Sequence, residues 1–196
     1  MGLDMYLMAQ KYESRSTWRF EEGHYKEIGE GINQIVKEFY PEDLQKIGLK
    51  HIKDNFLSKQ TRYQIGYWRK FNALQTFFQK RVESDYELCH GIYVHEDTIK
   101  DLISRFNKIL KDIKTCETGE IQYCNGWANG EKTYATAKVY KSEVAKDLLP
   151  PGAGFFYGSQ EIDEWYVEDI KYSLKLFKKA LELMKLGYDI IYEASW

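Results

Sequence analysis

The sequence is short of cysteine and has no long hydrophobic run, and both shortages exclude classes of protein. Its 196 residues include three cysteines, Cys89, Cys116 and Cys124, which form no CxxC pair. An odd and scattered set of this kind argues against a disulfide framework and fits a reducing compartment. No apolar run reaches the ~18 residues that a membrane span requires. We therefore expect a soluble, cytoplasmic protein with no membrane partner.

An excess of charge of one sign is also missing, since 28 Lys and Arg stand against 30 Asp and Glu, for a net charge of −2. A DNA-binding surface usually needs a basic excess, and a protein that mimics DNA needs a strongly acidic one. We expect no dedicated DNA-binding surface, although a local patch stays possible. The segment Met1–Met8 is apolar but short, carries Asp4 and lacks a basic flank, unlike a secretory signal.

Aromatic residues, by contrast, are abundant: they make up 16% of the chain, as 16 Tyr, 10 Phe and five Trp. Tyr and Trp combine apolar area with one polar group, so they enrich half-buried surfaces and binding sites. A chain of this length can bury about 70% of its unfolded surface, enough for a full core. No internal repeat or linker is visible, and a single domain over residues 1–196 is predicted.

Alternation of apolar and other residues predicts a strand over Leu3–Tyr12. Ile190, Ile191 and Tyr192 indicate a second strand over Tyr188–Trp196, and Leu88–Val94 can form a short one. Residues 13–31 indicate a loop or an irregular edge strand, and two short helices can follow over residues 33–47.

Two Asn-Gly pairs, at residues 125–126 and 129–130, mark tight turns. They predict a hairpin that pairs Glu120–Cys124 with Thr133–Tyr140. A helix over Thr133–Leu149 is the competing interpretation.

Three segments carry apolar residues at spacings of three and four, which predicts amphipathic helices over Thr61–Glu83, Glu96–Lys114 and Glu161–Leu186. Strands and helices do not alternate regularly, so parallel winding is not favoured. The predicted fold class is α+β, with a small antiparallel sheet that includes both termini and is packed by these three main helices.

Five blocks of the sequence carry a resemblance. They are MGLDMYL at residues 1–7, GYWRKFNA at 66–73, LLP at 148–150 followed by GFFYGS at 154–159, DEWY at 163–166, and YEASW at 192–196. In this order they resemble an uncharacterised family of small proteins encoded by bacteriophages and prophages. The resemblance spans almost the whole chain. It implies a phage or mobile-element setting in the cytosol of a bacterial host, and it brings no established activity.

The chain departs from that family at two places. The family has a His in the helix after the Tyr-Trp-Arg-Lys block where this chain has Gln75, so no role that needs an imidazole carries over. The segment of residues 115–140 resembles an insertion.

Trp68, Arg69 and Asn72 lie beside the apolar stripe of the first predicted helix. An Arg next to an exposed Trp can stack on a base, or clamp a phosphate or carboxylate through its planar fork. The alternative is a helix edge where Trp68 packs, Asn72 caps a neighbouring loop and Arg69 meets surface carboxylates.

A glycine-rich turn, Gly152–Ser159, leads into the last predicted helix. Backbone amides at a helix start can hold an anion, and Ser159 can add a hydroxyl. The spacing matches neither a phosphate-binding P-loop nor a dinucleotide fingerprint. The alternative, which we favour, is a turn in which Phe155 and Phe156 fill the core and Ser159 caps the helix.

Asp163 and Glu164 are expected in the first turn of that helix, where acidic residues complement the helix dipole. Catalysis or cation binding there would need further partners.

Cys89, His90 and His95 are ligand types for zinc, but their spacing matches no standard zinc module. We find no nucleophile elbow or Cys and His pair. No catalytic residue, metal or cofactor is predicted.

These observations favour a non-enzymatic binding protein of a phage or prophage. It would inhibit a host component, such as an antiviral defence system, by binding a host protein or sequestering a small nucleotide signal. The alternatives are an enzyme acting on a nucleotide or nucleic acid, and a structural or assembly factor of the phage. A site requires the Tyr-Trp-Arg-Lys block and the glycine turn to meet at one open hollow. The predicted binding residues are Trp68, Arg69, Asn72, Gly154, Gly158, Ser159, Asp163, Tyr166 and Trp196.

Overall fold

The computed structural model describes residues 2–14, 16–21, 24–29, 58–128, 130–154 and 157–196. The chain divides into two compact units, one of residues 1–9 and 63–196 and the other of residues 10–62. The single domain expected over the whole chain stays a prediction. The short helices expected over residues 33–47 lie outside the described residues.

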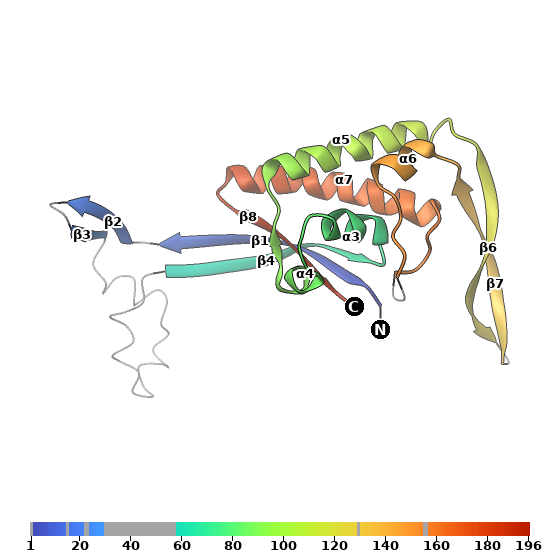
Figure 1. Ribbon diagram of the computed structural model, residues 1–196, viewed down its shortest axis with the longest axis horizontal. Helices are drawn as coiled ribbons and strands as arrows, with labels where there is room; N and C mark the ends of the chain where they lie inside the picture. Colours follow the sequence, from blue (N-terminus) through green and yellow to red (C-terminus); the bar gives the residue numbers. More distant parts are fainter. Residues whose placement is uncertain (1, 15, 22–23, 30–57, 129, 155–156) are drawn as a thin grey trace. The chain divides into compact units, whose positions relative to one another are not determined.

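A four-stranded sheet of order β4-β1-β8-β5 organises the larger unit, and its strands are Ser58–Arg69 (β4), Asp4–Ser14 (β1), Asp189–Ser195 (β8) and Ile92–Tyr93 (β5). The two terminal strands form its inner pair, as the sequence predicted, and they run in opposite directions (Figure 1). β5 pairs antiparallel with β8, with Ile92 opposite Tyr192. The fold is α+β.

The alternation seen in the first strand decides which of its faces is buried. Leu3, Met5 and Leu7 are fully buried, whereas Asp4 and Tyr6 between them are only partly buried. Successive side chains of a strand point to opposite faces, so β1 turns one apolar face to the core.

Helices α5 (Glu96–Asp112) and α7 (Glu164–Lys185) confirm two of the three long helices expected from the sequence. They lie side by side and run in opposite directions (Figure 1). Their apolar stripes meet in the core that the sheet also lines, where the rings of Phe106 and Phe177 have centroids 6.1 Å apart.

The first long helix predicted, Thr61–Glu83, is wrong over its first half. Strand β4 continues to Arg69, and a short helix, α3, covers only Asn72–Gln79. Within β4 the burial alternates between exposed Tyr67 and buried Gly66 and Trp68, a period of two. A Cβ added at Gly66 would lie 2.1 Å from Leu176 Cδ2, so glycine lets α7 approach the strand. Tertiary packing, which the local pattern does not contain, decides this segment.

The segment Leu88–Val94, expected as a strand, is strand only at Ile92–Tyr93. Helix α4 (Asp85–His90) occupies the residues before it, begun by a capping box in which the Ser84 and Glu87 side chains satisfy each other's backbone amides. Gly91 ends this helix with a φ of 92°, a conformation that favours glycine.

The predicted hairpin is confirmed and is longer than expected, with β6 at Thr118–Ala128 and β7 at Glu131–Tyr140. The competing helix is restricted to α6, Glu143–Leu148, whose N-terminus is capped by Ser142. The base of the hairpin is tied to the start of α7, because Tyr140 N donates to Ile162 O at 2.8 Å.

The smaller unit contains an antiparallel hairpin of β2 (Ser16–Glu21) and β3 (His24–Gly29), where a loop or irregular edge strand was expected. Across the described ranges, no helix is long and apolar enough to cross a membrane. The three cysteines are free.

Candidate functional site

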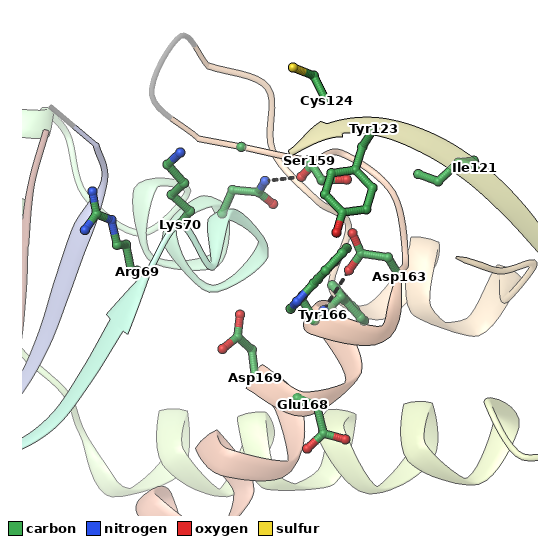
Figure 2. A pocket seen from close by; sticks show the side chains of 13 residues that line it. Arg69, Lys70, Ile121, Tyr123, Cys124, Ser159, Asp163, Tyr166, Glu168 and Asp169 are labelled. Carbon is green, nitrogen blue, oxygen red and sulfur yellow. Dashed lines mark hydrogen bonds between the residues drawn. The ribbon is translucent and has the colours of Figure 1, made fainter. Parts of the chain in front are cut away.

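One hollow of ≈ 620 Å³ is bounded by the end of β4, the loop before α7, the first turns of α7 and strand β6 (Figure 2). It includes six of the nine binding residues predicted from the sequence, together with residues that the sequence did not indicate. The lining residues are Arg69, Lys70, Asn72, Ile121, Tyr123, Cys124, Gly158, Ser159, Asp163, Trp165, Tyr166, Glu168 and Asp169.

The basic side of the hollow comes from Arg69 and Lys70, both exposed, where β4 ends. Lys70 N donates to Leu3 O at 2.8 Å, which holds the end of β4 against β1. Lys70 has a φ of 62°, which is uncommon for a side-chain-bearing residue and turns the chain from β4 toward α3. Figure 2 shows both cations on the side opposite Asp163 and Tyr123.

Asn72 fixes the loop before α7 to the start of α3. Its Nδ2 donates to Tyr157 O at 3.0 Å and also to Ser159 O, and its Oδ1 accepts from Gly152 N at 3.1 Å. The side chain is buried, so these bonds satisfy it inside the protein. Asn72 therefore shapes the hollow by holding the loop, as the alternative interpretation of this residue expected.

The glycine turn contributes Gly158 and Ser159 to the hollow. Gly158 has a φ of 82°, a conformation that favours glycine, and a Cβ there would lie 3.3 Å from Lys70 Cδ. The expectation that Ser159 caps the helix is wrong, because its Oγ accepts from Glu161 N at 3.1 Å and the helix begins later. Phe155 and Phe156 lie outside the described residues.

Asp163 is the N-cap of α7, since its carboxylate accepts from Tyr166 N at 2.9 Å. It is 3% exposed, and the cap bond and the helix dipole both stabilise its charge. The helix starts at Glu164, so Asp163 precedes the first turn in which it was expected.

Asp169, six residues after Asp163 on α7, has its pKa raised to about 7, first by burial and then by the charges of Asp163 and Glu168. Its carboxyl is therefore partly protonated near neutral pH, and it can both donate and accept a hydrogen bond. Figure 2 shows Asp169 on the α7 side of the hollow, with Glu168 pointing away from the two cations.

Aromatic side chains complete the wall. Trp165 is 46% exposed, and its ring meets that of Tyr123 edge to face, with centroids 4.9 Å apart. Tyr166 is buried and its hydroxyl donates to Leu149 O at 2.8 Å. Burial raises the pKa of Tyr166, so it stays a neutral donor held by the loop.

Three predicted binding residues do not line the hollow. Trp68 is not exposed as the stacking hypothesis required: it is 2% exposed, and its Nε1 donates to Ser173 Oγ at 2.8 Å in the core. Gly154 packs against the ring of Tyr157, and a Cβ added at Gly154 would lie 2.8 Å from that ring. Trp196 is exposed at the chain end and lines none of the described cavities.

Sequence reasoning missed Lys70, Tyr123, Trp165 and Asp169. Helical spacing could have indicated Asp169, which lies four residues after Trp165 and therefore on the same side of α7. Nothing in the local sequence placed Tyr123, because the direction in which a hairpin leaves the core depends on its tertiary contacts.

The part of the chain that the structure describes holds no group of three His, Cys, Asp or Glu side chains suited to a metal ion. The lining instead offers two cations, an exposed indole and a carboxyl that titrates near neutral pH, which suits recognition of a polar small molecule. Comparison of the chain with protein-family models, curated proteins and solved structures finds no match.

Proposed function

We propose that the protein binds a small nucleotide in the hollow between β4, β6 and α7 without chemically altering it. It would act as a phage- or prophage-encoded inhibitor that sequesters a nucleotide signal of a host component such as a defence system. The observation that carries this proposal is the placement of two cations, the exposed Trp165 and the neighbouring Tyr123 around one cavity of ligand size.

The dimensions and the cations suit a phosphate-bearing ligand. Small-molecule sites are typically clefts of about 300–1,000 Å³, and this hollow measures ≈ 620 Å³. The guanidinium of Arg69 can bind a phosphate through two parallel hydrogen bonds, while Lys70 supplies a point charge beside it. The hydroxyl of Ser159 lies in the same lining as a further polar group.

The aromatic wall suits the base of a nucleotide. Trp165 exposes almost half of its surface and is steadied by Tyr123. Stacking of a base on such a ring contributes about 1–3 kcal/mol. This exposed ring takes the role that the sequence suggested for Trp68, which packs in the core instead.

The carboxyl groups of α7 suit the hydrogen-bond donors of a sugar or base. Asp163 already accepts the bond from Tyr166 N and keeps further acceptor capacity. Asp169 adds a group that can accept or donate near neutral pH. Cys124 is the thiol of the lining, and its Sγ donates to Gly126 O at 3.4 Å. Binding without turnover is therefore the function that this geometry favours.

The first experiment measures binding of AMP, ATP, GTP and cyclic di-AMP to the purified protein by isothermal titration calorimetry. A hydrogen bond to a charged group is worth about 1.5–3 kcal/mol, so Arg69→Ala should weaken binding by roughly 10-fold to 150-fold. Lys108→Ala is the matched control, because Lys108 is an exposed cation on α5 outside this lining. If none of the nucleotides binds at millimolar concentration, or if both variants weaken binding equally, the proposal fails.

A second experiment separates binding from turnover. Nucleotide incubated with the protein and then released by heat should be recovered intact by chromatography and mass spectrometry. Conversion of the nucleotide, with or without added Mg²⁺, would instead support the enzyme alternative. The same release from protein purified out of a bacterial host identifies the natural ligand, if one is retained.

A further inference from the structure

A second surface feature lies where α5 and α7 pack side by side, two helices that Figure 1 shows running along each other. Four lysines line a cavity of ≈ 590 Å³ there, and three line an adjoining cavity of ≈ 440 Å³. The two cavities share Leu110 and Lys171, so they form one continuous groove. Its six lysines, counting Lys171 once, are Lys111, Lys114, Lys138, Lys171, Lys175 and Lys178.

Helical periodicity explains why these lysines gather. On α7, Lys171, Lys175 and Lys178 are spaced four and three residues apart, so they form one stripe of about 10 Å at 1.5 Å per residue. At the end of α5, Lys111 and Lys114 are spaced three apart. Both stripes flank the apolar seam between the helices, and Lys138 of β7 extends the row.

The charge of this groove is almost entirely positive. The single acidic residue of its lining is Glu168, whose Oε1 lies 2.6 Å from Lys171 Nζ. All six lysines are exposed. The dipole of α5 favours cations at its C-terminus and accounts for Lys111 and Lys114. It does not account for Lys138 on a strand, or for Lys175 and Lys178 in the middle of α7.

Two tyrosines are interleaved with the lysines. Tyr140 lines the first cavity with Lys138 Nζ 5.1 Å from its ring centroid, and Tyr172, 42% exposed, lines the second. A row of cations with aromatic rings between them is the arrangement that binds single-stranded nucleic acid, because the cations follow the backbone and the rings stack on bases. An acidic peptide would use the lysines but would gain less from the rings.

We propose that the α5–α7 groove binds the phosphate backbone of single-stranded nucleic acid. The net charge of −2 hides this patch, because the acidic residues that balance the lysines lie elsewhere on the chain. The groove shares Glu168 with the lining of the nucleotide hollow, and its lysines and tyrosines belong to the groove alone.

The number of lysines sets the expected dependence of binding on salt concentration. Six phosphate contacts give a slope of log K against log salt of about −4, at roughly 0.7 per contact for a single strand. Binding should then weaken about 300-fold between 50 mM and 200 mM salt. Relative to a 1 M salt reference at which the ionic contribution is taken as zero, each contact is worth about eightfold at 50 mM, so loss of two should cost roughly 60-fold.

The test uses fluorescence anisotropy of fluorescein-labelled dT12 and U12 with the full chain at 50 mM NaCl. The groove variant is Lys175→Glu with Lys178→Glu. The control with the same charge change is Lys80→Glu with Lys179→Glu, which lie outside the groove lining. We expect binding of one or both oligonucleotides, a loss of 60-fold or more in the groove variant, and a loss below fivefold in the control.

Three results would overturn this inference: no binding of either oligonucleotide at 50 mM salt, equal losses in the two double variants, or tighter binding of labelled polyglutamate than of dT12 and U12. The last would assign the groove to an acidic protein surface. Arg69→Ala should leave oligonucleotide binding unchanged, so failure at the nucleotide hollow and failure at the groove can be told apart. A preference for U12 over dT12 or the reverse would identify the natural polymer.

Discussion

Replacement of Asn72 by Ala should loosen the loop that shapes the hollow between β4, β6 and α7. The substitution removes the three hydrogen bonds that join Asn72 to Gly152, Tyr157 and Ser159. Each is worth about 1 kcal/mol net, and the buried Gly152 amide loses its partner, which places the loss near 3 kcal/mol. The better helix propensity of Ala returns about 0.5 kcal/mol at this helix-start position. We expect the free energy of unfolding to fall by about 2–3 kcal/mol.

Urea denaturation and calorimetry measure this loss. For a chain of this size 1 kcal/mol shifts Tm by about 2–4 °C, so Asn72→Ala should lower Tm by roughly 5–10 °C. Asn107→Ala is the control, because Asn107 is exposed on α5 and should change stability by no more than about 0.5 kcal/mol. A loss below 1 kcal/mol for Asn72→Ala would refute the assignment of this side chain as the anchor of the loop.

Three further predictions test the packing and the electrostatics. Gly152→Ala should cost about 1–3 kcal/mol, because its Cβ would lie 1.9 Å from Thr76 Oγ1, and Thr76→Ala should recover part of that loss in a double-mutant cycle. Trp68→Ala should cost about 3–5 kcal/mol in urea denaturation, since the indole is buried and bonded to Ser173; a cost under 1 kcal/mol would contradict its place in the core. The raised pKa of Asp169, about 7 against an ordinary 3.8, means that the native state binds more protons between pH 4 and pH 7, so stability should fall as pH rises through that window. Asp169→Asn should flatten this dependence and be more stable than the parent at pH 8, and an unchanged pH profile would show that the carboxyl is not held in a buried site.

The periodic parts of the fold could be predicted from sequence because the side of each element that is apolar in sequence is the side that is buried in the structure. The stripe of α5 and the alternation of β1 each have one apolar side and one polar side, and each buries the apolar one. The apolar spacing over residues 61–83 wrongly predicts a helix throughout. Gly66 lies in a strand that packs closely against Leu176, more than a hundred residues later. Local spacing carries no information on such a pairing.

The site divides in the same way. The sequence could indicate that the end of the Tyr-Trp-Arg-Lys block and the glycine turn carry suitable groups, and the structure places Arg69, Asn72 and Ser159 around one hollow. It could not indicate which aromatic residue faces that hollow. Trp68 is buried within β4, whereas Trp165 is exposed on α7, where its ring meets Tyr123 of the hairpin, and the local sequence contains neither contact.

Strand β6 forms one wall of the hollow, and its residues can be substituted with little loss of stability. Among the described residues of the hairpin strands only Ala137 is buried, and the main core is assembled from other elements. Changes at exposed hairpin positions should therefore cost no more than about 0.5 kcal/mol each. Substitutions in the β6–β7 hairpin can therefore change the lining of the hollow, while the elements that form the main core stay unchanged.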